Sequence, residues 1–167
     1  MTMSHQVTEG FDDVTDVLDY PMFVVTTAHG ERRAGCLVGF ATQVSIDPPR
    51  FLVGLSERNQ TYRVAMDASR LVVHLLGADS LELARLFGES TGDDTDKFAR
   101  CSWRPGPDGV PVLDDAPAWF SGPIRDRVRL GDHTGFLIDV DAAKVRRQPD
   151  RLLRLSDAAA FDPGHPA

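Results

Sequence analysis

The chain is poor in cysteine: its 167 residues contain only Cys36 and Cys101. Two cysteines are too few for a disulfide framework, and they are not spaced as a metal-binding pair. The sequence also lacks a metal-ligand cluster, a Ser/His/Asp order typical of hydrolases and a glycine-rich dinucleotide fingerprint. We therefore expect neither disulfide stabilisation nor a bound metal.

Basic residues are also scarce relative to acidic ones, with 18 Lys and Arg against 25 Asp and Glu and a net charge of −7. This balance argues against a general binder of nucleic acids or anionic membranes. No apolar run approaches the roughly 20 residues of a membrane span. Residues 1–6 have neither the basic region nor the apolar core of a signal peptide. We expect a cytoplasmic protein.

Apolar residues make up 42% of the chain, an ordinary share for a globular protein. The length suffices for one full core without cross-links. We expect a single domain over residues 1–167, with its core at about 11–147 and flexible tails, including a disordered segment over residues 1–9.

Runs rich in β-branched residues, separated by closely spaced turns, predict a mainly β fold. Residues 33–40 and 41–46 are expected to be strands that form one long bent strand with a break near Gly39. A turn marked by Pro48 and Pro49 follows. The other strands are expected at residues 22–27, 51–55, 71–76, 118–128 and 134–140. The pattern favours an antiparallel β-barrel with short peripheral helices that plug its ends.

Apolar residues at helical spacing predict a short helix over residues 11–18, which we expect to cap one end of the barrel. The sequence from Asp79 to Glu82 resembles a capping box. His74, within a predicted buried strand, is expected in the core. The remaining short helices are expected over residues 59–68, after residue 79, over residues 96–99 and around residues 152–155.

The most informative stretch is residues 35–61, which read GCLVGFATQVSIDPPRFLVGLSERNQT. Gly35 and Gly39 carry no Cβ, so the backbone there can approach a flat group closely. The polar loop that opens the next helix offers backbone N–H groups, hydroxyls and Arg58, which are the groups that a phosphate needs.

This stretch resembles the signature of the flavin reductase-like family, the FMN-binding split barrels, which ends in Ser-x-Asp-Pro-Pro. Two later segments also resemble that family. They are Gly-Val-Pro-Val-Leu-Asp-Asp-Ala-Pro-Ala-Trp at residues 109–119 and Gly-Asp-His-Thr at residues 131–134. The three motifs occur in the family's order and cover roughly residues 20–145.

The resemblance implies a Greek-key antiparallel split barrel and a homodimer that buries the flavin near the subunit interface. It implies an NAD(P)H:flavin oxidoreductase that passes a hydride from NADH or NADPH to FMN, with FAD as the alternative flavin. Reduced flavin would then go to a partner such as an oxygenase component.

The resemblance also assigns site residues. His133 would hold the nicotinamide as the catalytic residue, with Asp132 beside it, and Phe98 could shelter the ring. Residues of the first motif would hold the flavin ring: Val38, Gly39, Phe40, Ala41, Thr42 and Gln43. Residues of the polar loop would hold the phosphate: Ser56, Arg58, Asn59 and Thr61.

Several of these residues also have an ordinary structural interpretation. Ser56 or Asn59 can simply cap a helix, His133 and Asp132 can belong to a plain turn, and Phe98 can be core. Cys36 is better explained as a buried, inert thiol than as a redox group.

The sequence departs from the family signature at Leu37, Gly39 and Gln43, where side-chain hydrogen bonds to the ring would be lost. Two alternative functions therefore stay open. One is a flavin carrier or redox module without NAD(P)H turnover, and the other is a structural dimer that binds no flavin.

Overall fold

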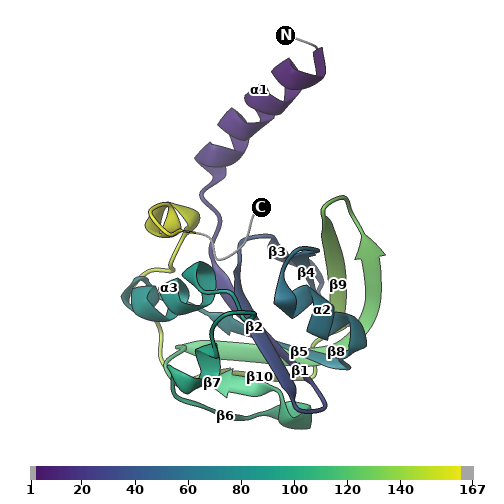
Figure 1. The fold of residues 1–167 in the computed structure, drawn as a ribbon, viewed down its shortest axis with the longest axis vertical. Helices are drawn as coiled ribbons and strands as arrows, with labels where there is room; N and C mark the ends of the chain where they lie inside the picture. Colours follow the sequence, from purple (N-terminus) through teal and green to yellow (C-terminus); the bar gives the residue numbers. More distant parts are fainter. Residues whose placement is uncertain (1–2, 163–167) are drawn as a thin grey trace.

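The computed structural model describes residues 3–162. Its main element is an eight-stranded sheet with antiparallel pairing and strand order β2-β1-β5-β8-β9-β4-β3, to which β10 adds by pairing with β8 (Figure 1). These strands are β1 (Phe23–His29), β2 (Arg32–Val38), β3 (Ala41–Ser45), β4 (Arg50–Ser56), β5 (Arg70–Leu75), β8 (Ala118–Arg129), β9 (His133–Asp139) and β10 (Ala142–Val145). A separate hairpin is formed by β6 (Trp103–Pro105) and β7 (Pro111–Leu113).

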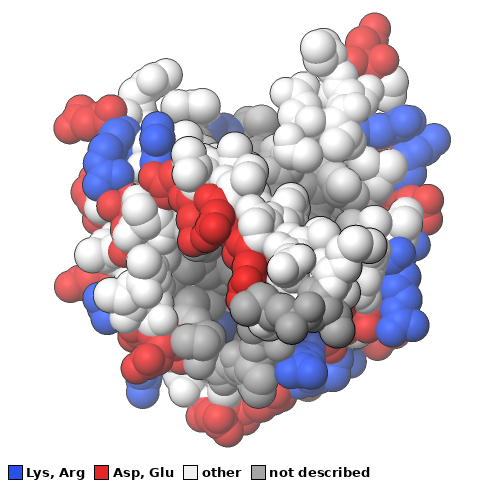
Figure 2. Space-filling model, turned by 90° about the horizontal axis from the view of Figure 1, so that it is seen from above, with Lys and Arg blue, Asp and Glu red and all other residues white. Residues whose placement is uncertain are grey.

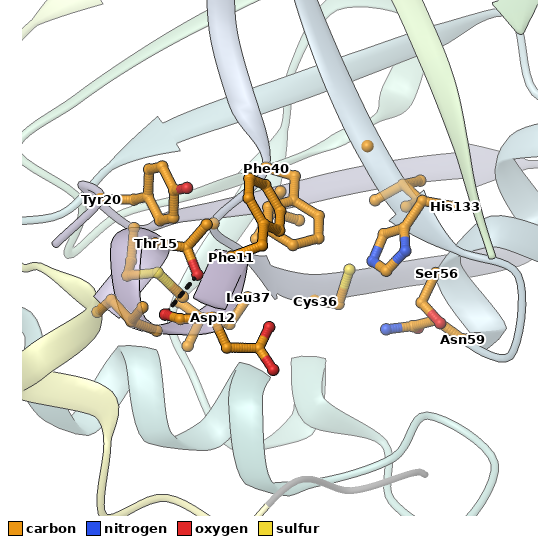
Figure 3. A pocket seen from close by; sticks show the side chains of 16 residues that line it. Phe11, Asp12, Thr15, Tyr20, Cys36, Leu37, Phe40, Ser56, Asn59 and His133 are labelled. Carbon is orange, nitrogen blue, oxygen red and sulfur yellow. Dashed lines mark hydrogen bonds between the residues drawn. The ribbon is translucent and has the colours of Figure 1, made fainter. Parts of the chain in front are cut away.

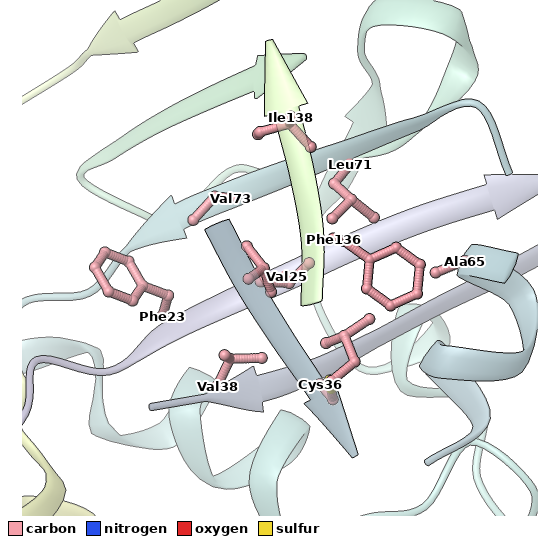
Figure 4. Packing of buried hydrophobic residues seen from close by; sticks show 11 residues of the cluster. Phe23, Val25, Cys36, Val38, Ala65, Leu71, Val73, Phe136 and Ile138 are labelled. Atoms are coloured by element: carbon pink, nitrogen blue, oxygen red, sulfur yellow. The ribbon is translucent and has the colours of Figure 1, made fainter. Parts of the chain in front are cut away.

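The long strand β8 joins the two halves of the sheet. Its first part pairs with β5 and β10, its second part pairs with β9, and the register shifts between Ile124 and Asp126. The sheet curls there, so that apolar side chains from both halves meet in one core (Figure 4). Val25 and Val73 come from one half, and Val53 and Phe136 from the other; all four are fully buried. The mainly β barrel expected from the sequence is confirmed.

Short helices surround this barrel. The α-helices are α1 (Met3–Leu18), α2 (Gln60–Asp67) and α3 (Leu81–Glu89), and the 3-10 helices are η1 (Ala78–Ser80), η2 (Lys97–Ala99), η3 (Pro107–Gly109) and η4 (Leu155–Ala158). α3 buries Leu83 and Phe87, one turn apart, in a second core cluster. Leu153, near the end of the chain, is fully buried in the same cluster.

The expectation for the N-terminal segment was wrong in two respects. The helix begins at Met3, so residues 3–9 are helical rather than a disordered tail. It buries none of its residues and rises away from the sheet, so it does not cap the barrel (Figure 1). The apolar spacing correctly predicted a helix, but spacing alone does not show what the apolar side chains contact.

Two further expectations need correction, and the strand β10 was missed. Residues 33–46 form two strands, β2 and β3, which separate at Gly39 and lie at opposite ends of the strand order. Asp79 lies inside η1, and the residue before α3 is Ser80, whose side chain makes no capping bond to that helix, so the capping box is absent there. β10 was not predicted, because its four residues carry little apolar alternation.

Residues 3–162 were searched for membrane-spanning helices and for metal-binding groups. No helix there is long and apolar enough to cross a membrane. Within the same range, no group of three or more His, Cys, Asp or Glu side chains is arranged to hold a metal ion.

His74 is a fully buried side chain that joins three strands, as its predicted place in the core requires. Its Nδ1 lies 2.9 Å from the carbonyl oxygen of Val24 in β1, and the Leu113 N–H in β7 donates to Nε2 at 3.0 Å. Burial lowers the pKa of His74 from 6.5 to about 4, with a smaller contribution from Arg146. The imidazole is therefore neutral, because protonating Nε2 would remove the acceptor for Leu113.

This depressed pKa predicts acid-sensitive stability. The unfolded chain binds a proton at His74 near pH 6.5 and the folded chain only near pH 4, so stability is lost as the pH falls between these values. The loss should reach about 3 kcal/mol below pH 4. Urea unfolding across this range should show a steeper pH dependence for the wild type than for His74→Gln. The exposed-site control His29→Gln should behave like the wild type, and an unchanged slope in His74→Gln would contradict the assignment.

Candidate functional site

A pocket of about 660 Å³ opens between the last turns of α1 and the point where β2 leads into β3 (Figure 3). This volume lies within the roughly 300–1,000 Å³ of small-molecule sites. Five separate parts of the chain form it, namely residues 11–22, 36–40, 54–59, 133 and 155. Its lining residues are Phe11, Asp12, Thr15, Tyr20, Met22, Cys36, Leu37, Val38, Gly39, Phe40, Gly54, Leu55, Ser56, Asn59, His133 and Leu155.

Aromatic rings form one wall of the pocket. The ring of Phe40 is 57% exposed and lies between Tyr20 and His133, at centroid distances of 6.4 Å and 4.9 Å (Figure 3). The Gly54 N–H donates to the Phe40 carbonyl oxygen at 2.7 Å, and a Cβ at Gly54 would lie 3.2 Å from the Phe40 Cβ. Gly54 thus permits the close approach that presents the Phe40 ring to the pocket.

His133 stands at the start of β9, directly opposite Ser56 of β4. Its Nδ1 lies 2.7 Å from a carboxylate oxygen of the exposed Asp132. The hydrogen bond to His133 holds the pKa of Asp132 below its usual value. Since the carboxylate accepts a hydrogen bond from Nδ1, the Nε2 atom is the ring nitrogen left for a ligand.

The start of α2 supplies the polar end of the pocket. The Asn59 side chain accepts a hydrogen bond from the Thr61 N–H at 2.9 Å, and the Ser56 hydroxyl lies 3.4 Å from the Arg58 N–H. Asn59 therefore caps α2, as the structural interpretation of the sequence proposed. Capping and ligand binding are compatible, because the first N–H groups of a helix lack intrahelical acceptors.

Cys36 lines the pocket but is only 3% exposed. Burial raises the pKa of its thiol, and Lys97, Thr61 and Asn59 act in the opposite direction. Lys97 is also buried, and its Nζ donates to the carbonyl oxygens of Gly35 at 2.9 Å and Phe87 at 3.2 Å. Both groups are part of the packing between β2 and α3, which agrees with an inert Cys36.

The predicted site residues fall into two groups. Those that line the pocket are Val38, Gly39, Phe40, Ser56, Asn59 and His133. Those that do not line it are Ala41, Thr42, Gln43, Arg58, Thr61, Phe98 and Asp132.

The residues of the second group lie in different places. Thr42 and Gln43 are exposed on β3, and Arg58 is exposed on the turn between Ser56 and Asn59. Phe98 packs in the second core cluster, with its ring between Phe87 and Trp103 at 5.7 Å from each. It touches a separate pocket of about 390 Å³.

Sequence reasoning missed the contribution of residues 11–22. Phe11, Asp12, Thr15, Tyr20 and Met22 all line the pocket. The helical spacing of residues 11–18 was visible, but nothing in it showed that the helix would border a pocket. Leu37 also lines the pocket, at a position where the family signature has a polar residue.

The residues that line the pocket suit a ligand that has a flat ring and a charged tail. Apolar and aromatic side chains such as Phe11, Leu37 and Phe40 can cover the faces of a ring, while Ser56 and Asn59 offer polar groups at one end (Figure 3). Arg58 follows Ser56 at that end, where a phosphate would benefit from a cation and a helix start. The residues present therefore fit a flavin with a phosphate group.

Comparison with known proteins identifies the class. The family model described as "Flavin reductase like domain" matches residues 16–159. This match spans most of the chain, and the chain belongs to that family.

Two similar proteins support this membership. The chain is 33% identical over 113 residues to a "Probable flavin reductase" of Rhizobium meliloti (strain 1021), covering 65% of this chain and 35% of the relative. It is 33% identical over 130 residues to "FMN reductase (NADH) RutF" of Methylorubrum extorquens (strain DM4), covering 78% and 63%. The chain thus spans less than two thirds of the length of these two relatives.

A solved structure supports the fold. The flavin reductase of the styrene monooxygenase from Pseudomonas putida S12 matches with a TM-score of 0.72 and 26% identity, covering 83% of this chain and 89% of that one. The split-barrel architecture expected from the sequence is therefore confirmed.

The two glycines of the first motif have different surroundings, which predicts different effects of a methyl group. A Cβ at Gly35 would lie 2.8 Å from the buried Phe87 ring, whereas at Gly39 it would meet only the flexible Met22 side chain, at 3.1 Å from Sδ. Gly35→Ala should lower the free energy of unfolding by about 1–3 kcal/mol, and Gly39→Ala by less than about 1 kcal/mol. Urea unfolding of both variants at one pH measures this, and equal losses would contradict the packing described.

Proposed function

We propose that this chain is an NAD(P)H-dependent flavin reductase that uses FMN and passes reduced flavin to a partner oxygenase component. The observation that carries the proposal is the pocket itself, which combines a wall of aromatic rings with a polar end at the start of α2. Family membership and the printed activities of the relatives support it. A homodimer and a cytoplasmic location belong to the same proposal.

The bound flavin would supply the redox chemistry by accepting at N5 the hydride that leaves nicotinamide C4. The protein itself then has to bind the flavin and orient it toward the nicotinamide. Phe40 and Leu37 would cover the ring faces, and the backbone of residues 38–43 would face the polar ring edge. Ser56, Arg58, Asn59 and Thr61 would hold the phosphate, and Phe98 would act only at a distance, through the packing beside Lys97.

His133 would act on the nicotinamide nucleotide. Asp132 holds the imidazole through Nδ1, so Nε2 would be free to bind a ligand beside the Phe40 ring. Such positioning lowers the barrier because the reacting atoms must come within about 3–3.5 Å of each other. The apolar walls would also exclude water from the reacting atoms.

An anaerobic titration with NADH, in the presence of added FMN, tests the reductase activity. Bleaching of the flavin absorbance band at a catalytic rate is the expected result. Bound FMN that NADH and NADPH both fail to bleach would overturn the proposal in favour of a flavin carrier. A protein whose melting temperature does not rise with FMN or FAD would exclude flavin binding altogether.

Two variants test the site. Arg58→Ala should weaken FMN binding about tenfold or more, because a hydrogen bond to a charged group contributes about 1.5–3 kcal/mol. His133→Ala should mainly slow NADH oxidation and leave FMN affinity within about threefold. Arg63→Ala is a matched control, since Arg63 pairs with Asp93 on the exposed side of α2. If both site variants match Arg63→Ala, the residue assignment is wrong.

A further inference from the structure

Lys97 is a buried lysine whose charge no carboxylate compensates. It is one of two lysines in the chain and is 5% exposed, whereas the other, Lys144, is exposed on β10. Its Nζ donates to the carbonyl oxygens of Gly35 and Phe87 and lies 5.5 Å from the centre of the Phe87 ring. Among residues 3–162, no carboxylate forms an ion pair with it. Neutral groups alone therefore hold the ammonium group.

Acidic residues share a pocket with Lys97 but do not pair with it. This second pocket, of about 390 Å³, is the one that Phe98 touches. The acidic residues that line it are all exposed to solvent: Glu31, Asp93, Asp94 and Asp96. Burial lowers the pKa of Lys97, and the group that opposes this effect is the Cys36 thiol rather than a carboxylate.

A buried cation of this kind is unfavourable without a negative charge nearby. Carbonyl oxygens satisfy two of the three ammonium protons, but they do not replace the hydration that the charge has lost. A well-packed apolar side chain of similar volume is often at least as stable in such a place. The charge on Lys97 therefore indicates that an anion approaches this part of the protein.

The candidate site lies on the other side of a shared wall. Cys36 in β2 and Asn59 before α2 line the first pocket, while the adjacent Gly35 and Gln60 line the second pocket together with Lys97. Lys97 and Cys36 each shift the pKa of the other, so their charges are close enough to interact. The wall between the two pockets consists of β2 and the start of α2.

Thr61 contributes an unused hydroxyl to this wall. The residue is 1% exposed, and its Oγ1 has no nitrogen or oxygen partner among the described residues. With Asn59, it favours the thiolate form of Cys36, so it faces a sulfur atom, which is a weak acceptor. Buried hydroxyls usually have a hydrogen-bond partner. An anionic oxygen at the start of α2 would supply a strong one.

The surface around the mouth of the first pocket supplies little positive charge. Seen from the side on which α1 rises, acidic side chains cross the middle of the molecule and most Lys and Arg lie toward its rim (Figure 2). α1 contains no Lys or Arg, and its Asp12 lines the pocket. A phosphate in this pocket therefore needs a positive charge further inside.

We infer that Lys97 is the buried counter-charge for the flavin phosphate, and that Thr61 donates a hydrogen bond to the same phosphate. Lys97 acts by its charge across the wall, where the low dielectric of the interior strengthens the attraction. The chain thereby selects phosphorylated flavin over riboflavin, which lacks the phosphate. The inference deepens the proposed function and rests on it for the identity of the ligand. The exposed Arg58 adds a charge that solvent and salt screen more strongly.

Titration of the apoprotein with FMN and with riboflavin, followed by flavin fluorescence, tests the inference. Lys97→Met should raise the FMN dissociation constant about tenfold or more, a change of at least about 1.4 kcal/mol, and change that of riboflavin less than about threefold. Lys97→Arg keeps the charge and should retain most of the preference for FMN. The matched control Lys144→Met, on the exposed strand β10, should leave both constants unchanged.

Thr61→Val gives a second test that does not depend on the folding of the Lys97 variants. It removes a buried hydroxyl that has no partner, so stability should change little, while the preference for FMN over riboflavin should fall about threefold or more. Repeating the titrations at about 0.5 M KCl should reduce the effect of Arg58→Ala and preserve that of Lys97→Met. Loss of the Lys97→Met effect at this salt concentration would contradict a charge that acts from the interior.

The outcomes separate this inference from the reductase activity. Equal weakening of FMN and riboflavin binding by Lys97→Met would limit Lys97 to packing and overturn the inference, and so would a wild type without preference for FMN. Neither result affects the bleaching of bound flavin by NADH. If FMN binding depends on Lys97 but neither NADH nor NADPH bleaches the flavin, the reductase activity is wrong and the role of Lys97 stands. A protein that binds no flavin overturns both.

Discussion

The structure depends on one strand serving two halves of a sheet. β8 must leave its pairing with β5 and enter a pairing with β9, and the chain bends where the register shifts between Ile124 and Asp126. Gly122 stands at this crossing, and a Cβ there would collide with the carbonyl group of Asp139. The hydrogen bond from the Asp141 N–H to the Ser121 carbonyl oxygen, at 3.0 Å, holds the same crossing on the other side. A side chain at Gly122 would prevent the curl that encloses the core.

A buried arginine fixes the neighbouring elements. Arg70, at the start of β5, donates to Asp108 in η3 and to both carboxylate oxygens of Asp141, and it also bonds Ser121 in β8. The hydrogen bonds that Arg70 donates to Asp141 raise the pKa of Arg70, so the guanidinium stays charged. The carboxylates of Asp108 and Asp141 compensate the buried positive charge of Arg70. An unpaired buried charge would destabilise the fold strongly. The network joins the β6–β7 hairpin to the barrel.

The position of the candidate site is set by the separation of β2 from β3 in the sheet. β2 and β3 are consecutive in sequence but lie at opposite ends of the strand order, so the chain between them crosses an opening. Gly39 and Phe40 lie in that crossing, and His133 and Ser56 meet across the β4–β9 pair beside it. The pocket is thus made by backbone topology, and its chemistry depends on which side chains occupy the crossing. Phe40 supplies an exposed ring there, whereas Leu37 adds apolar surface where the family signature has a polar group.

The sequence by itself determined the elements and the family. Alternating apolar residues located most of the strands, the prolines at 48 and 49 marked a turn, and three short motifs in the right order identified the flavin reductase-like fold. Local patterns suffice there because strand formation and turns depend largely on neighbouring residues. Only the tertiary structure decided that Phe11 and Tyr20 border the pocket, that Phe98 belongs to the core, and that α1 buries none of its residues. These features depend on contacts between residues far apart in the chain, and the periodicity of one segment does not state which surface will face it.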